Sequence, residues 1–220
     1  MTDNFLSYKD YIKNCNELSM SFPSNDDSRF CYVIELIRRG KDHPELPAAN
    51  YHFKNYYIFS LEQLNKYEEE IKTLCKTFGF RAYASVNYKD LQQVMLDTNA
   101  EMARRIALND FKRPHAIFES CLGKNTPKAS GRFIVDIDNI DINTKEGAEE
   151  LHSVKEVINS CKSEYFESRQ IIVKVFLTRS GLHIITRPFN LAEFREKCKA
   201  KGLPEYDVKK NHVTLLYEDL

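Results

Sequence analysis

The stretch GRFIVDIDNID, residues 131–141, places carboxylates in a run that otherwise has the composition of a buried strand. Alternate residues of a strand face the same side, so Asp136 and Asp138 project together, with Cα atoms about 6.6 Å apart. Neighbouring carboxylates on a buried face repel each other, and burial makes each charge more costly. A divalent cation such as Mg²⁺ removes both problems, because it prefers carboxylates together with water and substrate phosphates. The alternative is an exposed strand end with hydrated aspartates, and Asp141 is assigned to the loop.

The segment TRSGLHIITRPF, residues 178–189, holds a second group of polar residues, and these suit phosphates. Gly181 lets the backbone approach a ligand closely, Ser180 offers a hydroxyl, and His183 lies in the strand that follows. No carboxylate occurs from residue 168 to 192, whereas basic residues are present at Arg169, Lys174, Arg179 and Arg187. A basic hairpin beside an acidic strand is what a site for metal and phosphate requires. A lone histidine on an apolar strand is nevertheless more often an ordinary core residue.

A third carboxylate, Asp207, opens the segment DVKK near the end of the sequence. By itself an aspartate at the start of a strand is unremarkable. Asp219 lies close enough in sequence to be an alternative third carboxylate.

The first 130 residues contain alternating strand and helix patterns after an unassigned, mixed beginning. Strands are predicted at residues 29–39, 55–60 and 80–88, with helices at 61–78 and 91–109. Ser60 is expected to cap the first of these helices, and Gly79 to end it. Residues 112–130 have no firm periodicity and are predicted to be a loop or insertion, near which any domain boundary falls.

The last 90 residues contain a strand with Asp136 and Asp138, followed by a helix at 145–161 that Thr144 is expected to cap. Residues 170–177 and 182–189 then predict a hairpin, which is followed by a short helix stopped by Gly202 and by one or two final strands. The complete pattern is β-α-β-α followed by β-α-β-β-α-β. It predicts an α+β fold, with helices on a mostly antiparallel sheet.

Bulk composition favours neither a nucleic acid nor a membrane as partner, because 32 Lys and Arg balance 32 Asp and Glu among 220 residues. The six cysteines are scattered without metal-binding spacing, which is typical of reduced thiols. No apolar run approaches the length that spans a membrane, and the N-terminus has no signal-peptide pattern. We therefore expect a cytoplasmic protein without a membrane association.

In order and character, FIVDIDN, RSGLHII and YDV resemble the three motifs of the archaeo-eukaryotic primase superfamily, the primase-polymerases, and in particular its small phage and plasmid members. Those motifs are a DhD or DhE strand, an SxH or SGxH hairpin and a strand with a hydrophobic residue before Asp. The resemblance covers residues 131–220 and implies an RRM-like antiparallel catalytic unit there. Residues 1–130 match the family's N-terminal αβ unit only in general pattern.

The resemblance implies a DNA primase or polymerase that transfers nucleotides from NTP or dNTP to a 3′-hydroxyl on a nucleic-acid template. It implies Mg²⁺ or Mn²⁺ as cofactor, with Asp136, Asp138 and Asp207 as ligands. The residues implied at the nucleotide phosphates are Ser180, Gly181 and His183, assisted by Arg179, Lys174 or Arg187. DNA template and primer and nucleoside triphosphates would be the partners, together with a helicase or other replication proteins. A template channel could use Arg38, Arg39, Arg81, Arg104 and Arg105, although a solvated surface role is commoner for such arginines.

Other functions use similar residues. A glycosyltransferase also places a metal on DxD, but no nucleotide-binding fold precedes the motif here, and a HAD-type phosphatase needs its DxD early in the chain. A metal-dependent nuclease remains open because its ligands are the same. A non-catalytic nucleic-acid-binding accessory subunit of a replication complex also remains open. It would need exposed aromatic residues on the sheet, for which the candidates are Tyr83, Tyr88 and the pair Tyr56–Tyr57.

Overall fold

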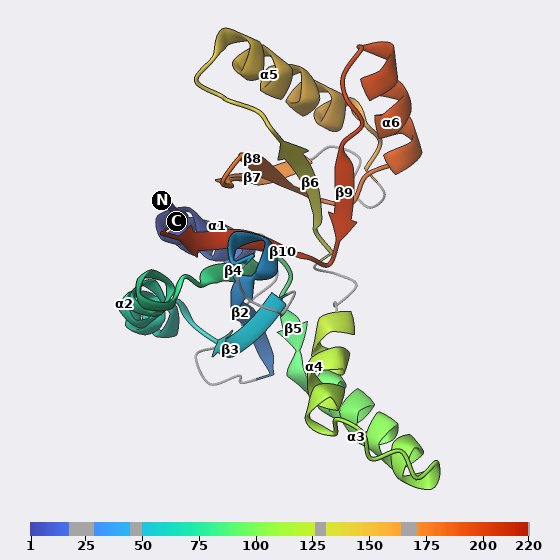
Figure 1. Ribbon diagram of the computed structural model, residues 1–220. Coiled ribbons are helices and arrows are strands. Elements are labelled where there is room, and N and C mark those ends of the chain that lie inside the picture. Colours follow the sequence, from blue (N-terminus) through green and yellow to red (C-terminus); the bar gives the residue numbers. More distant parts are fainter. Residues whose placement is uncertain (18–28, 45–49, 126–130, 164–170, 220) are drawn as a thin grey trace.

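The computed structural model describes residues 1–17, 29–44, 50–125, 131–163 and 171–219, which form two antiparallel sheets and six α-helices (Figure 1). The α+β class predicted from the sequence is therefore confirmed. No helix in these ranges is long and apolar enough to cross a membrane.

The first sheet is six-stranded and includes the last strand of the chain. Its order is β1 (Thr2–Asp3), β10 (Val213–Glu218), β4 (Arg81–Ser85), β2 (Phe30–Arg39) and β3 (Asn50–Ile58), and β5 (Lys89–Asp90) also pairs with β2. The predicted unit of residues 131–220 thus does not keep all its strands in one sheet, because β10 lies between β1 and β4. The two ends of the chain consequently lie side by side (Figure 1).

The second sheet is four-stranded and comes from one continuous part of the sequence. Its spatial order is β7 (Ile172–Leu177), β8 (Gly181–Thr186), β6 (Phe133–Asp138) and β9 (Asp207–Lys210), and all neighbours are antiparallel. The predicted hairpin is confirmed by the pairing of β7 with β8. The final segment of the sequence forms two strands, and these belong to different sheets.

Helices cover both sheets, and several begin and end where the sequence predicts. The helices are α1 (Phe5–Glu17), α2 (Leu61–Phe78), α3 (Leu91–Ala107), α4 (His115–Lys124), α5 (Lys145–Ser160) and α6 (Leu191–Ala200). The Ser60 hydroxyl accepts a hydrogen bond from the Gln63 amide, and Thr144 does the same for Gly147, which confirms both caps. Gly79 ends α2 with a φ of 64°, in the left-handed region that glycine adopts most easily.

Two helices were absent from the sequence prediction. Residues 112–130 are predicted to be a loop or insertion, and the loop is wrong for 115–124, where α4 forms and packs on α3; residues 126–130 lie outside the described ranges. Only Ile117 and Leu122 of α4 are buried, which is too few to produce a helical period. Helix α1 lies in the unassigned beginning, although Phe5, Tyr8 and Ile12 follow helical spacing and are buried.

Two cores hold the second sheet in place. One face of this sheet carries Val135, Ile137 and Ile184 against α5 and α6, which lie at the top of Figure 1. The opposite face turns Ile134, Ile185 and Phe176 toward the first sheet, where they share a core with α1 and α2. Alternate residues of each strand therefore serve different cores, as the period of two requires.

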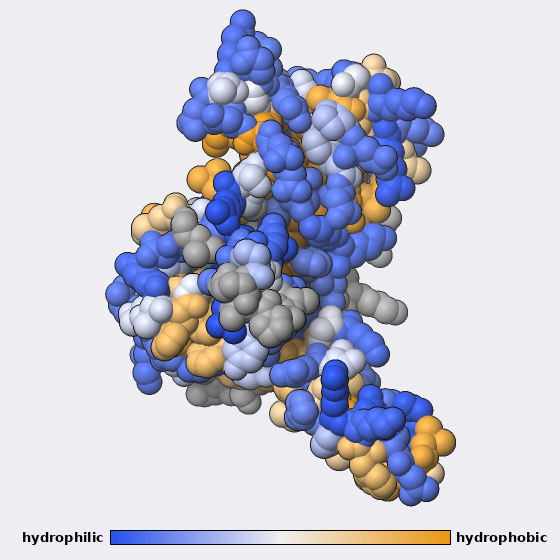
Figure 2. Space-filling view, in the orientation of Figure 1, coloured by the Kyte–Doolittle hydropathy of each residue, from blue (hydrophilic) through white to orange (hydrophobic). Residues whose placement is uncertain are grey.

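Helices α3 and α4 project away from both sheets at the lower right of Figure 1. The buried residues of α3 are Leu91 and Val94, both in its first turn. Beyond them its apolar side chains are exposed, and Figure 2 shows hydrophobic surface on this projection; the residues are Met95, Leu96, Met102 and Ile106. The outer part of the projection thus makes little contribution to the apolar cores.

Candidate active site

The register of the second sheet brings the three sequence motifs into one row. Asp136 of β6 pairs with His183 of β8 on one side and with Asp207 of β9 on the other. Directly paired residues of antiparallel strands lie about 4.5–5.5 Å apart and point to the same face. The row faces the first sheet, because Ile134 on the same face of β6 belongs to the core shared with that sheet. Residues predicted from separate motifs are therefore neighbours in space.

Asp136 is the central residue of this row. Its Oδ1 atom lies 3.2 Å from Nε2 of His183, and Lys209 donates a short hydrogen bond to its Oδ2 atom. The His183 hydrogen bond lowers the pKa of the Asp136 carboxyl well below its usual range; burial opposes this and Lys209 adds to it. Asp136 consequently remains ionised although its side chain is only 12% exposed.

Both ring nitrogens of His183 have protein partners. Besides the contact of Nε2 with Asp136, Nδ1 lies 2.9 Å from the hydroxyl of Thr214, a buried residue of β10. A threonine hydroxyl can donate to an unprotonated Nδ1 or accept from a protonated one, so it suits either charge state of the ring. The first sheet thereby orients a residue of the second. The predicted contact of His183 with nucleotide phosphates stays a prediction.

Lys209 is a residue that the sequence analysis did not single out. It lies two residues after Asp207 on β9, and its Nζ atom is 3.8 Å from Oδ2 of Asp207. The ammonium therefore lies near both Asp136 and Asp207. The only signal in the sequence was the spacing of two, which puts Asp207 and Lys209 on one face of a strand.

The carboxylates differ strongly in exposure. The side chain of Asp207 is 69% exposed, and Asp138 is also exposed at the end of β6. Asp207, and not Asp219, is the aspartate paired with Asp136, because Asp219 follows β10 in the other sheet. The row thus runs from a buried end at His183 to an exposed end at Asp207.

Gly181 has a structural explanation that differs from the predicted one. It pairs with Asp138, and a Cβ atom at this position would lie 1.9 Å from the carbonyl oxygen of Ile137. Only glycine therefore allows β8 to approach β6 at this point. Close approach of the backbone to a ligand is not needed to account for this residue.

A cleft of about 350 Å³ lies between the two sheets, over the His183 and Asp136 part of the row; Asp207 is outside its lining. The carboxylates that line it are Asp136 and Asp138, and Ser180 and His183 line it as well. Its cationic lining comes from both sheets and consists of Arg39, Lys41, Arg81, Arg179 and Lys209. A cleft with carboxylates on one strand and several cationic groups around them can hold an anion next to a metal ion.

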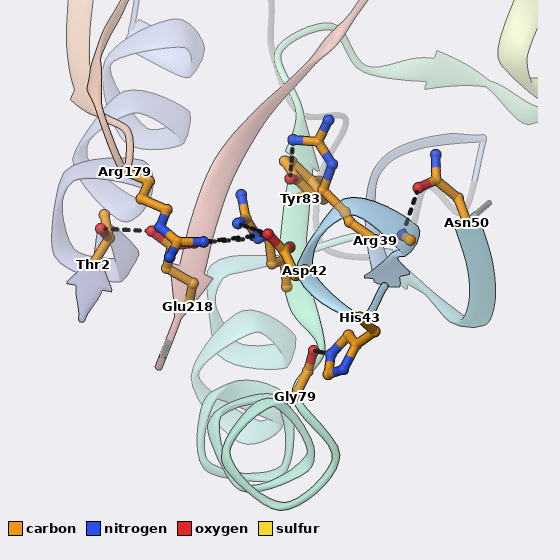
Figure 3. Close-up of polar contacts among 11 residues, drawn as sticks. Thr2, Arg39, Asp42, His43, Asn50, Gly79, Tyr83, Arg179 and Glu218 are labelled. Carbon is orange, nitrogen blue, oxygen red and sulfur yellow. Dashed lines mark hydrogen bonds and ion pairs between the residues drawn. The ribbon is translucent and has the colours of Figure 1, made fainter. Parts of the chain in front are cut away.

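Arg179 connects the hairpin of the second sheet to the first sheet (Figure 3). Its guanidinium lies 3.2 Å from Oδ1 of Asp42, and the same oxygen accepts a hydrogen bond of 2.8 Å from Arg81. Nε of Arg81 in turn lies 3.3 Å from a carboxylate oxygen of Glu218, whose side chain is only 2% exposed. This chain of alternating charges fixes one end of the cleft.

The other predicted basic residues are divided between the cleft and remote surfaces. Arg39 lines the cleft, and its guanidinium lies 3.4 Å from the Tyr83 hydroxyl (Figure 3). Lys174 is outside the cleft lining and forms an ion pair of 3.6 Å with Asp10, and Arg187 is buried outside that lining too. The remaining arginines of the predicted template channel lie elsewhere: Arg38 stacks over Tyr51, and Arg104 and Arg105 pair with Glu101 on α3.

The predicted aromatic residues lie mostly within the apolar cores. Tyr56 is buried, Tyr57 packs against Phe118, and Tyr88 packs against Phe30. Tyr83 lines the cleft. Of the four candidates for base stacking, Tyr83 is thus the one placed where a ligand of the cleft could reach it.

The donor atoms fit a hard divalent cation. Carboxylate oxygens of Asp136 and Asp207 already converge on one cationic group, the ammonium of Lys209, and Asp138 lies on the same face of β6. In the described ranges, no three His, Cys, Asp or Glu side chains form a cluster with metal-binding spacing. Mg²⁺ commonly takes one or two carboxylates and completes its shell with water and phosphate oxygens.

Comparisons with models of known protein families, with curated proteins and with solved structures find no match to this chain.

Proposed function

We propose that the protein is a primase-polymerase-like nucleotidyltransferase, which adds nucleotides to a 3′-hydroxyl on a DNA template. The observation that carries the proposal is the single row formed by His183, Asp136 and Asp207. The three segments that resemble motifs of the archaeo-eukaryotic primase superfamily contribute one residue each to this row. Chance matches to three short motifs would have no reason to meet on adjacent strands.

The topology of the second sheet supports an RRM-like catalytic unit. Its elements follow the chain order β6-α5-β7-β8-α6-β9, which is the β-α-β-β-α-β motif, and they form one four-stranded antiparallel sheet. The helices cover one face, and the opposite face carries the polar row.

In the proposed reaction, the 3′-hydroxyl attacks the α-phosphate of an NTP or dNTP, and pyrophosphate leaves. Asp136, Asp138 and Asp207 would hold Mg²⁺ or Mn²⁺, which when bound stabilises the attacking and leaving oxygens. Ser180 and Arg179 lie at the turn beside the carboxylates and would contact the phosphates. His183 and Lys209 lower the pKa of Asp136 and keep it ionised, which is the form that binds a metal ion, but a metal ion would have to displace the Lys209 ammonium from its Oδ2 atom.

A second candidate is a non-catalytic nucleic-acid-binding subunit that works with a helicase or other replication proteins. One observation favours it: the charge of Asp136 is already balanced by the Lys209 ammonium, and its other oxygen contacts His183. In such a subunit the row would be a structural ion-pair network, and the cationic cleft would bind nucleic-acid phosphates.

Extension of a labelled primer-template in Mg²⁺ or Mn²⁺, with each nucleotide pool and an unprimed reaction alongside, tests the proposal. We expect longer products with the wild type, none with the Asp136→Ala/Asp138→Ala double variant, and normal extension with Asp141→Ala. Asp141 is the matched control, because it follows the same strand but lies in the loop. Shortening of the label would support a nuclease instead, and unchanged label with bound DNA would support the accessory subunit.

A further inference from the structure

Lys209 is the cationic side chain that the two carboxylates of the row share. It donates to Oδ2 of Asp136, and its Nζ atom is 3.8 Å from Oδ2 of Asp207. The register explains why: Lys209 pairs with Ile134, which has the same orientation as Asp136. The ammonium thus lies where a cation bridging these carboxylates would have to bind.

The neighbouring lysine provides an internal comparison. Lys210 pairs with Phe133, and its Nζ atom lies 5.0 Å from the centre of that ring. Phe133 belongs to the core on the helix-covered face. Two adjacent lysines of β9 therefore lie on opposite faces, and only Lys209 contacts the row.

A divalent ion and the Lys209 ammonium compete for the same oxygens. At separations of a few ångströms, the repulsion between a doubly charged ion and an ammonium is strong even with substantial dielectric screening. Lys209 is able to leave, because its side chain is 30% exposed and lines the cleft. Its four-carbon chain is also flexible, and the ammonium binds phosphate as well as carboxylate.

We propose that Lys209 is an exchangeable internal cation of the site. Without metal it bridges Asp136 and Asp207; when a divalent ion takes these oxygens, the ammonium turns into the cleft and binds the phosphates of the nucleotide. The second half of this exchange rests on the proposed function. The site consequently has weak affinity for free metal and strong affinity for metal that arrives with a triphosphate.

Binding of Mn²⁺ in the absence of nucleotide and DNA tests the first half, with free Mn²⁺ followed by electron paramagnetic resonance. We expect Lys209→Met to bind Mn²⁺ at least about tenfold more tightly than the wild type, because the competing charge is gone. Lys209→Arg retains the charge and Lys210→Met changes the other face, so both should bind like the wild type. Adding Asp136→Asn to Lys209→Met should remove the gain.

A titration with a non-hydrolysable dNTP and Mn²⁺ tests the second half. We expect Lys209→Met to bind this nucleotide about tenfold more weakly than Lys210→Met, in contrast to its tighter binding of free Mn²⁺. Opposite changes for the two ligands are not expected from a merely structural lysine, and thermal unfolding of each variant checks the fold.

Equal Mn²⁺ affinity in wild type and Lys209→Met would overturn the inference, and so would the lack of Mn²⁺ binding by every variant at millimolar concentration. These results are independent of catalysis. If the wild type extends primers but Lys209→Met does not bind Mn²⁺ more tightly, the exchange is refuted and the proposed polymerase activity is not affected. If Lys209→Met binds Mn²⁺ more tightly but the wild type does not extend primers, the polymerase is refuted and the exchange of Lys209 for a metal ion is supported.

Discussion

The two faces of the four-stranded sheet consist of alternate residues of the same strands, yet only one of them carries the polar row, beside apolar residues such as Ile134 and Ile185. The face covered by α5 and α6 carries Val135, Ile137 and Ile184, all fully buried. The face toward the cleft carries Asp136 and His183, one residue away along the chain. The difference teaches that a strand buried on both faces can place its polar residues on one of them, so that these residues can be altered with little change in the core on the other face.

The largest effect is expected for the central residue of the polar face. Asp136→Ala should reduce nucleotide incorporation about a thousandfold or more, because it removes a proposed metal ligand and leaves His183 and Lys209 without their shared partner. Primer extension measures the loss, and circular dichroism should show an intact fold. If Asp136→Ala and Asp138→Ala both retained activity, the metal assignment would be wrong.

A change on the face covered by α5 and α6 should lower stability and leave activity unchanged. Ile137→Ala should lower the free energy of unfolding by about 2–5 kcal/mol, because it leaves a cavity among fully buried side chains. Urea unfolding measures this loss. Incorporation per folded molecule should stay near the wild-type value, and an activity loss larger than the folded fraction explains would show that the faces are coupled.

Thr214 offers a test of the support that the first sheet gives to the polar face. Thr214→Val retains the shape but removes the hydroxyl, so Nδ1 of the buried His183 loses its partner, at a cost of about 1–3 kcal/mol. Thr214→Ser retains the hydroxyl and should behave like the wild type. Nitrogen NMR of the imidazole reports the change directly, and identical ring signals in Thr214→Val would contradict the role.

The smallest effect is expected in the loss of stability at acidic pH. The folded pKa of Asp136 is lowered, so its stabilising contribution is complete above about pH 4, the ordinary value, and is lost as the pH falls below it. Between pH 5 and 2, the free energy of unfolding of Asp136→Asn should therefore fall by roughly 1–2 kcal/mol less than that of the wild type. Ile137→Ala should show the same pH dependence of the free energy of unfolding as the wild type. Thermal unfolding at several pH values checks both, and parallel curves for wild type and Asp136→Asn would refute the coupling.

Local signals were sufficient to predict most elements from the sequence. Ser60, Gly79 and Thr144 act on their own helices within a few residues, so their roles follow from short-range rules. Helix α4 escaped prediction because its Leu122 is buried in a core that it shares with residues of α3 and β2, which are distant in sequence. Burial that depends on distant elements leaves little periodicity in a segment.

The site was predictable to the extent that a resemblance could align distant residues. Asp136, His183 and Asp207 came from motifs, and the register places them side by side. Thr214 was not predictable, because nothing in its segment indicates that β10 belongs to the other sheet. Lys209 was hidden by its commonness: a lysine near an aspartate is usually a solvated residue, and only the pairing of β9 with β6 brings it to Asp136.

The position of β10 has a consequence for the order in which the two sheets can form. The second sheet is encoded by residues 133–210, and all its strands have been made before β10. The first sheet needs β10 between β1 and β4, so these strands cannot be joined until a segment that follows the whole second sheet in sequence is in place. The second sheet can therefore pair its strands within one continuous stretch of sequence, whereas closure of the first sheet requires Thr2 to meet Glu218, a contact of long sequence separation that costs more chain entropy.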